Sequence, residues 1–152
     1  MILTTEYKPE YRDKVLELVK EFEQEYFGEF GLETNLETFD QAIEEQKDSC
    51  FILMDDDKIA GVLSGMLVKG FAATGITWHE VLWYVRKPYR QSMYGMVLFD
   101  KACESLKARG VKNIMTSHLA NKVGERMGRI YKRLGFKEFE THYIKRIDDG
   151  SN

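Results

Sequence analysis

The spacing of the apolar residues changes along this sequence, and the change fixes the order of its helices and strands. Short runs rich in β-branched and aromatic residues indicate strands, whereas apolar residues three and four positions apart indicate helices. We expect strands over residues 2–8, 50–54, 58–68, 75–85, 111–117 and 136–147. We expect helices over residues 9–28, 35–46, 95–110 and 121–134. The order β-α-α-β-β-β-α-β-α-β predicts an α/β fold with a mixed sheet in a single domain.

Two helices carry more detailed expectations. Thr34 and Glu37 have the spacing of a capping box, which would begin the second helix. The fourth helix places a row of apolar residues on one side, which we expect to be buried. These residues are Val123, Met127, Ile130, Tyr131 and Leu134.

Length and composition limit the class of protein. The chain has 152 residues, 43% of them hydrophobic, which suits one domain over 1–147 followed by a short polar tail over 148–152. Cys50 and Cys103 have no spacing typical of disulfide frameworks or zinc sites. The N-terminus lacks the pattern of a signal peptide, and the longest apolar run, residues 59–68, is too short to span a membrane. We therefore expect a cytoplasmic protein without a membrane partner.

Charge is divided unevenly along the chain. Residues 1–57 hold 17 acidic and 5 basic residues, a net charge of −12, whereas residues 86–137 hold 13 basic and 3 acidic residues, a net charge of +10. The second half favours an anionic ligand, although solvated helix faces are an equally good interpretation. The overall charge of −3 argues against general nucleic-acid binding.

The stretch from residue 81 to 115 is the most informative part of the sequence. A strand ends near Val85, a short loop holds Arg90, Gln91, Ser92, Met93 and Tyr94, and a helix begins near Gly95. The first backbone N–H groups of a helix have no intrahelical acceptor, and the helix dipole favours negative charge there. This turn is therefore a candidate phosphate site.

Two motifs resemble those of the GNAT superfamily of acetyl-coenzyme A-dependent N-acetyltransferases. VRKPYRQSMYGMVL resembles the family's Q/R-x-x-G-x-G/A loop, with Arg90 at the first position, Gly95 at the last and Met93 in place of the first glycine. MGRIYKRLGFKEF resembles the closing A-x-x-x-Y-x-x-x-G-F motif, with Tyr131, Gly135 and Phe136 in register. The resemblance implies the GNAT fold, with a central splay between the strands that flank the third helix.

The resemblance also implies acetyl-coenzyme A as acyl donor. Its pyrophosphate would bind the N–H groups of Gln91 to Met96, and its pantetheine arm would pair with the backbone of Trp83 and Val85. The family's pantetheine-binding asparagine is replaced by Gly124, so Asn121 either substitutes for it or caps the helix. The implied cofactor-binding residues are Trp83, Val85, Arg90, Gln91, Ser92, Met93, Tyr94, Gly95, Met96 and Asn121.

Three residues are candidates for proton transfer. The resemblance implies that Tyr131 protonates the departing thiolate, although a core aromatic is the competing interpretation. Strict alternation along the strand puts His79 on the same face as Val85, where the family often has its base, and turns Glu80 to the other face. An ordinary surface histidine is the competing interpretation of His79.

The amine acceptor would approach across residues 26–34 and 138–143, by the same resemblance. Tyr26, Phe27 and Phe30 would form aromatic walls, and Glu29 or Glu33 would supply a counter-charge for a cationic amine. A plain surface loop is equally compatible with this sequence.

Three functions follow in order of preference. The first is N-acetyl transfer by direct attack of a small-molecule or protein amine, in a monomer or homodimer. The second is a catalytically silent GNAT domain that binds the cofactor or another protein, which the residues Met93 and Gly124 favour. A nucleic-acid-binding module is third. Binding of single-stranded nucleic acid requires aromatic residues interleaved with basic residues, and this sequence lacks that pattern.

Overall fold

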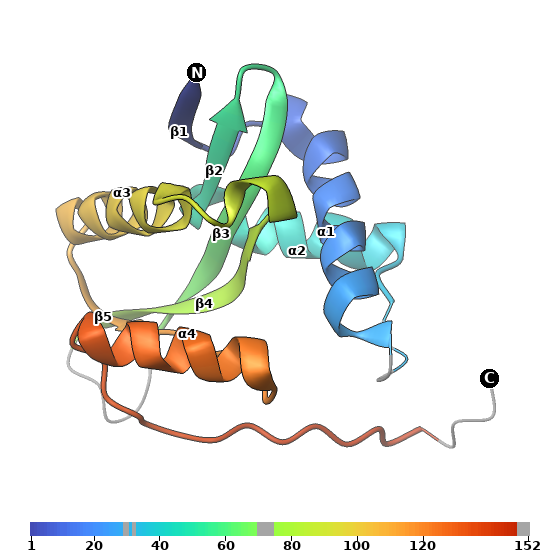
Figure 1. Cartoon of the computed structure of the whole chain (residues 1–152). Coiled ribbons are helices and arrows are strands. Elements are labelled where there is room, and N and C mark those ends of the chain that lie inside the picture. The colour runs from blue at the N-terminus through green and yellow to red at the C-terminus, as the bar shows by residue number, and fades with distance from the viewer. Residues whose placement is uncertain (29–30, 32, 70–74, 149–152) are drawn as a thin grey trace. The chain divides into compact units, whose positions relative to one another are not determined.

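The computed structural model describes residues 1–28, 31, 33–69 and 75–148, which form two compact units, Met1–Thr116 and Ser117–Asn152. Figure 1 labels their helices and strands. The first unit contains strands β1 (Ile2–Glu6), β2 (Cys50–Asp55), β3 (Lys58–Val68), β4 (Ile76–Val85) and β5 (Val111–Met115). Its helices are α1 (Arg12–Tyr26), α2 (Leu36–Gln46) and α3 (Tyr94–Ala108), with single 3-10 turns η1 (Pro9–Tyr11), η3 (Lys47–Ser49) and η4 (Lys87–Tyr89).

The sheet of the first unit is mixed and mostly antiparallel, as expected. Its strand order is β1-β2-β3-β4-β5, with antiparallel pairs up to β4 and a parallel pair between β4 and β5. The pairing of β4 with β5 ends at His79 and Met115, so β5 does not continue alongside residues 80–85. This separation of β4 from β5 is the central splay.

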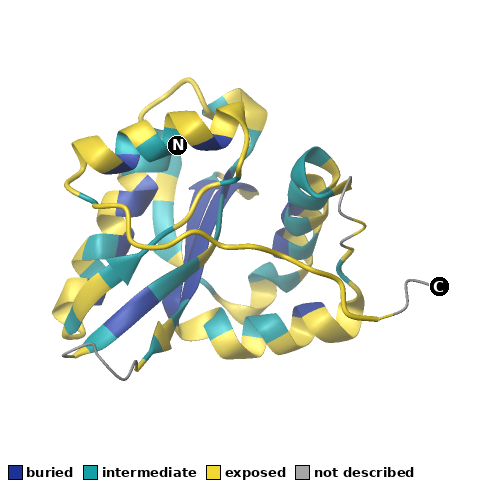
Figure 2. Cartoon of the chain, turned by 90° about the horizontal axis from the view of Figure 1, so that it is seen from below, coloured by how far each residue is buried: buried dark blue, intermediate teal, exposed yellow. Residues whose placement is uncertain are grey.

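Helices cover both faces of this sheet. On one face, α1 and α2 bury Leu18 and Phe39 against Ile52 and Val62. On the other face, α3 buries the row Leu98, Ala102 and Leu106 that its helical spacing predicts. The buried residues gather along the strands in Figure 2.

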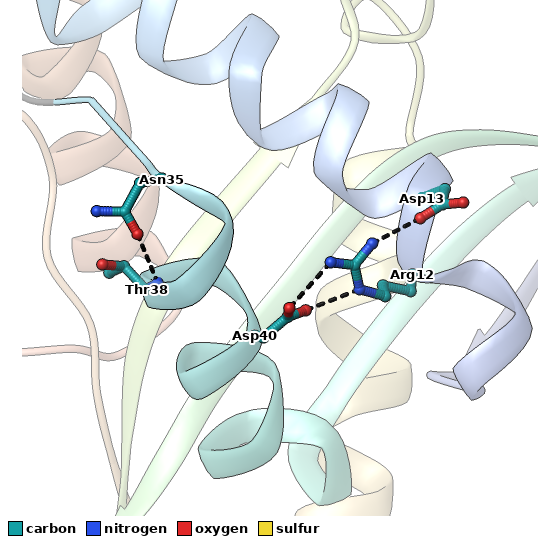
Figure 3. Close-up of polar contacts among 5 residues, drawn as sticks. All are labelled: Arg12, Asp13, Asn35, Thr38 and Asp40. Atoms are coloured by element: carbon teal, nitrogen blue, oxygen red, sulfur yellow. Dashed lines mark hydrogen bonds and ion pairs between the residues drawn. The ribbon is translucent and has the colours of Figure 1, made fainter.

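An ion pair joins α1 to α2, and a side-chain cap begins α2 (Figure 3). The Arg12 guanidinium donates to both carboxylate oxygens of Asp40, at 2.7 and 3.0 Å, and to Asp13 at 2.7 Å. Asn35 caps α2 by accepting a hydrogen bond of 2.8 Å from the Thr38 N–H. The capping box expected at Thr34 is therefore wrong, because the Thr34 N–H and hydroxyl donate instead to Glu23 of α1.

The second unit is built around α4 (Lys122–Arg133). Asn121 caps this helix by accepting a hydrogen bond of 2.8 Å from the Gly124 N–H, and Gly135 follows it with a φ of 90°. Gly124 and Tyr131 are buried. Val123 and Leu134, which we expected on the buried side, are 52% and 41% exposed.

The strand expected over residues 136–147 does not form in the second unit. These residues are all described, yet they have no helical or strand structure, and Phe139, Tyr143 and Ile147 are 80%, 93% and 94% exposed. Figure 2 shows this stretch as an exposed, extended chain. A stretch rich in aromatic and β-branched residues is a local signal, whereas a strand also needs a neighbouring backbone to satisfy its N–H and C=O groups.

No helix among the described residues is long and apolar enough to cross a membrane.

Candidate functional site

The turn from β4 into α3 presents backbone donors that lack an acceptor within the helix. The first intrahelical hydrogen bond of α3 runs from the Val97 N–H to the Met93 carbonyl, at 2.9 Å. The N–H groups of Tyr94, Gly95 and Met96 precede it and so have no acceptor within the helix. The Met93 side chain does not cap the helix, and the Tyr94 N–H lies 3.4 Å from the Ser92 hydroxyl. This end of α3 can therefore accept an anion, as the sequence predicts.

Gly95 leaves space at that helix end. A Cβ atom built on Gly95 would have only Val85 Cγ2 near it, at 3.8 Å, so packing within the first unit does not require glycine. A ligand that approaches the backbone closely would require it. The position therefore fits a pyrophosphate group resting on the N–H groups of α3.

Met93 fits the turn without strain. Its φ is −76°, which any residue adopts, and its side chain is 73% exposed. The glycine of the family motif is thus not required by the backbone at this position. Neighbouring residues shape the turn as well, since the Ser92 hydroxyl donates to the Tyr89 carbonyl at 2.6 Å, and Gln91 is exposed.

Backbone groups of Trp83 and Val85 lie on the β5-side edge of β4, beyond the last pair with β5, and the Val85 carbonyl there accepts a hydrogen bond from Arg90. The Arg86 N–H donates to the Ala60 carbonyl of β3 at 2.9 Å. Because the backbone groups of a strand alternate between its two edges, the N–H and C=O groups of Trp83 and Val85 point away from β3, to the edge beyond the last pair with β5. This is the edge at which the resemblance implies pairing with a pantetheine arm. The Trp83 ring itself stacks on Phe99 of α3, at 5.2 Å between ring centroids.

Arg90 lies within a cluster of contacts at the base of the turn. Its Nη1 and Nη2 donate to the two carboxylate oxygens of Glu25 on α1, at 2.6 and 2.8 Å, and its Nε donates to the Val85 carbonyl at 2.6 Å. The hydrogen bonds from Arg90 hold the pKa of Glu25 at about 2, well below its ordinary value. The guanidinium is therefore committed to protein groups, which sequence reasoning did not foresee.

The two candidate bases lie on the faces opposite to those we expected. Ser64 pairs with Leu82 and Gly65 pairs with Glu80, so Val81 is an extra residue on β4. Directly opposite residues share a face of the sheet. Glu80 therefore lies on the α3 face, with Trp83 and Val85, whereas His79, opposite Met66, lies on the face of α1 and α2.

This β-bulge has a signal in the sequence. A Cβ atom on Gly65 would lie 2.2 Å from the His79 carbonyl oxygen and 2.5 Å from the Trp78 ring, so only glycine fits there. A glycine inside a strand often marks a bulge, and Gly65 could have warned that the alternation changes.

Tyr131 is held within the second unit. It is 7% exposed, and its hydroxyl donates to the Ser117 carbonyl at 3.1 Å. Its ring lies 5.5 Å from Phe136 and 6.5 Å from His118, measured between ring centroids. The residue thus combines the packing of a core aromatic with a polar group whose proton already has an acceptor.

Packing explains why residue 124 is a glycine, and Asn121 has a structural role as the cap of α4. A Cβ atom on Gly124 would lie 1.5 Å from the Leu119 carbonyl oxygen, so the family's asparagine does not fit at this position. Asn121 is the N-cap of α4, one of the two alternatives that the sequence left open. The His118 Nδ1 lies 2.9 Å from the same Leu119 oxygen, and because a carbonyl only accepts, Nδ1 carries the hydrogen.

The expected acceptor residues are only partly brought together. Tyr26 packs against Tyr84 of β4, at 6.3 Å, and Phe27 packs edge-on against Phe22, at 4.9 Å, so both belong to an aromatic cluster on the α1 face. Glu33 is exposed, and Glu29 and Phe30 lie outside the described residues. In the other expected segment, Glu138 pairs with Lys132 at 2.8 Å.

Neither cysteine is suited to nucleophilic work. Burial raises the pKa of Cys50 to about 12 and that of Cys103 to about 11, so both thiols stay protonated near neutral pH. Within the described ranges, no three histidine, cysteine or acidic side chains gather to hold a metal ion.

Comparison with solved structures gives the same fold at low sequence identity. An aminoglycoside acetyltransferase from an uncultured soil metagenomic sample is 18% identical, with a TM-score of 0.76 over 97% of this chain and 99% of the other. An acetyltransferase of Trypanosoma brucei is 15% identical, with a TM-score of 0.73 over 97% and 100%. Glucosamine-6-phosphate N-acetyltransferase of Arabidopsis thaliana is 17% identical, with a TM-score of 0.71 over 97% and 99%.

No curated protein matches the sequence. The family model described as "Acetyltransferase (GNAT) family" matches residues 15–136, which is most of the chain and includes both motifs. The chain therefore belongs to the GNAT acetyltransferase family.

Proposed function

We propose that this chain is an N-acetyltransferase that binds acetyl-coenzyme A and transfers the acetyl group to an amine by direct attack. One observation carries the proposal: the donors at the start of α3 are unpaired within the helix, and Gly95 leaves room beside them that packing does not use. Family membership supplies the reaction class. The family acts on many amines, so the proposed acceptor is a primary amine on a small molecule or a protein.

Different residues of the chain would serve cofactor binding and proton transfer. The N–H groups of Tyr94, Gly95 and Met96 would hold the pyrophosphate, and, as the family resemblance implies, the backbone of Trp83 would orient the pantetheine arm. Acetyl-coenzyme A supplies a thioester, whose carbonyl carbon forms the new bond to the amine nitrogen as its bond to sulfur breaks.

His79 is the preferred base, because the bulge places it on the α1 and α2 face, from which the family's acceptors approach. It would take a proton from the ammonium group at an imidazole nitrogen. Tyr131 would give its hydroxyl proton to the departing thiolate, which requires the hydroxyl to turn away from the Ser117 carbonyl. Glu80, on the α3 face, is the alternative base. The high pKa values of both thiols argue against a cysteine relay and support direct attack.

The cofactor assignment is tested by Gly95→Ala, with Gly28→Ala as control. A Cβ atom at Gly28 meets nothing within 4 Å, and neither glycine has a positive φ, so both variants should fold. Calorimetry with coenzyme A should show binding that weakens about tenfold or more in Gly95→Ala and is unchanged in Gly28→Ala. Equal affinities in the wild type and Gly95→Ala would contradict the assignment.

The catalytic assignment is tested by thiol release on a panel of amines. A wild-type protein that binds coenzyme A but releases thiol with none of them would favour the silent domain over the enzyme.

A further inference from the structure

Two acidic residues on α1 pair with two arginines that flank η4. Glu21 and Glu25 lie one helical turn apart, and Arg86 and Arg90 stand at the two ends of the turn that leads from β4 to α3. Arg86 meets Glu21 at 2.9 Å, and Arg90 meets Glu25 at 2.6 Å. The matching four-residue spacing joins α1 to the proposed phosphate turn through two ion pairs.

Both pairs are two-pronged, since Arg86 Nε and Nη2 meet the two Glu21 oxygens at 3.0 and 2.9 Å, and the pairs differ in exposure. The Glu21 side chain is 45% exposed, whereas the Glu25 side chain is 19% exposed. Glu25 also accepts a hydrogen bond of 2.8 Å from the Tyr84 hydroxyl, and the Arg90 guanidinium lies 5.0 Å from the centre of the Tyr84 ring. Charge-assisted, two-pronged contacts constrain a side chain more where the carboxylate is shielded from water, as at Glu25, than where it is exposed, as at Glu21.

Arg90 therefore has a fixed direction. Two of its nitrogens face Glu25, and the third donates to the Val85 carbonyl, the last backbone acceptor on the β5-side edge of β4. An arginine held in this way joins α1, the end of β4 and the start of the turn in one rigid corner. Its guanidinium donates to protein groups and does not serve as a phosphate ligand.

We propose that Glu25 is a positioning residue for the cofactor turn: it orients Arg90, which fixes the backbone of residues 86–93 so that the N–H groups at the start of α3 converge on the pyrophosphate. The inference rests on the proposed function, because it assigns this role at the same cofactor site. It assigns Arg90 to the protein framework, where the motif alone would make it a basic ligand of the anion.

The test compares Glu25→Gln with Glu21→Gln. Both variants remove one carboxylate from the same face of α1 and change the net charge equally, but they release different arginines, and only Glu25 also accepts the hydrogen bond of the Tyr84 hydroxyl. In the protein without ligand, amide hydrogen exchange over residues 87–96 should speed up at least about tenfold in Glu25→Gln and less than about twofold in Glu21→Gln. Equal exchange in the two variants would overturn the positioning role.

Affinity for coenzyme A, measured by calorimetry, separates positioning from direct contact. If Arg90 positions the turn, affinity should fall about tenfold in Glu25→Gln and about as much in Arg90→Lys, because an ammonium cannot reach Val85 and both Glu25 oxygens together. If Arg90 instead grips the phosphate, Glu25→Gln frees the guanidinium and affinity should hold or rise, which would refute the proposal.

A steady-state measurement adds a readout that a general loss of stability would not give. In Glu25→Gln the KM for acetyl-coenzyme A should rise about tenfold, whereas kcat and the KM for the amine should stay within about twofold. A fall in kcat with an unchanged KM would refute the positioning role. A wild-type protein that fails to bind coenzyme A would overturn the proposed function, and the exchange experiment would still decide whether Glu25 fixes the turn.

Discussion

Gly124→Ala should destabilise the second unit, although alanine is normally the better helix residue. In an unobstructed helix this substitution gains about 1 kcal/mol. Here the new Cβ atom would lie 1.5 Å from the Leu119 carbonyl oxygen and 2.5 Å from its carbon, and both are backbone atoms that cannot turn aside. The segment before α4 would have to move by more than an ångström.

The cost follows from the contacts that this movement breaks. The hydrogen bonds from His118 Nδ1 to Leu119 and from the Gly124 N–H to Asn121 both depend on the present path of residues 118–121. Each is worth about 1 kcal/mol, and the displaced packing adds about 1 kcal/mol or more. After the gain in helix propensity, we expect a net loss of about 2 kcal/mol.

Thermal unfolding followed by circular dichroism measures this loss. For a chain of this length, about 2 kcal/mol lowers the midpoint by about 4–8 °C. Gly128→Ala is the matched control, one turn further along the same helix, because its nearest atom is His118 Nε2, at 2.9 Å, in a side chain that can rotate. A Gly124→Ala protein that unfolds at or above the wild-type temperature would refute the reasoning.

Met93→Gly should leave the affinity for coenzyme A within about twofold, because Met93 is exposed and has an ordinary φ. It should lower stability by about 0.5–1 kcal/mol through the entropy of the unfolded chain. Calorimetry and thermal unfolding measure the two effects, and a large loss of affinity would mean that the methionine contacts the cofactor. Glu25 has a lowered pKa, so its ionised form stabilises the fold above its ordinary pKa of 4.5, and this contribution is lost as the pH falls toward about 2. The full shift corresponds to about 3 kcal/mol, and because solvent reaches both partners we expect Glu25→Gln to lose about 1–2 kcal/mol at pH 7 and little near pH 2. Denaturant titrations at several pH values measure this loss, and a difference that does not depend on pH would contradict the assignment. Tyr131→Phe should keep the affinity for coenzyme A and lower turnover, measured by thiol release, by about 10²-fold. The phenylalanine ring packs like that of tyrosine but has no hydroxyl proton to donate. Unchanged turnover would leave Tyr131 as a packing residue.

The elements that the sequence predicted well are those whose signals are local. Residues 94–108 form a helix because Leu98, Ala102 and Leu106 repeat at helical spacing, and the unpaired helix start follows from that boundary alone. The strand expected over residues 136–147 does not form, because the aromatic and β-branched residues of this stretch say nothing about a neighbouring backbone. Pairing is a tertiary property, which one stretch of sequence does not contain.

The candidate site was predictable where it depends on backbone and unpredictable where it depends on long-range contacts. The donors of Gly95 and Met96 belong to the former. The partner of Arg90 lies 65 residues away in sequence, and only the shared four-residue spacing of Glu21 and Glu25 with Arg86 and Arg90 hinted at it. The faces of His79 and Glu80 were reversed because one extra residue, Val81, breaks the alternation.

That extra residue sits two positions beyond the last pair between β4 and β5, where it bends and twists the strand. The gap between the strands is thus governed by the number of backbone residues in β4, more than by any one side chain. Substitutions at Val81 should leave the gap open. Deletion of Val81 would keep every pair with β3 while straightening the strand, so the length of β4 at this one position should decide whether the strand runs on beside β5 or turns away from it.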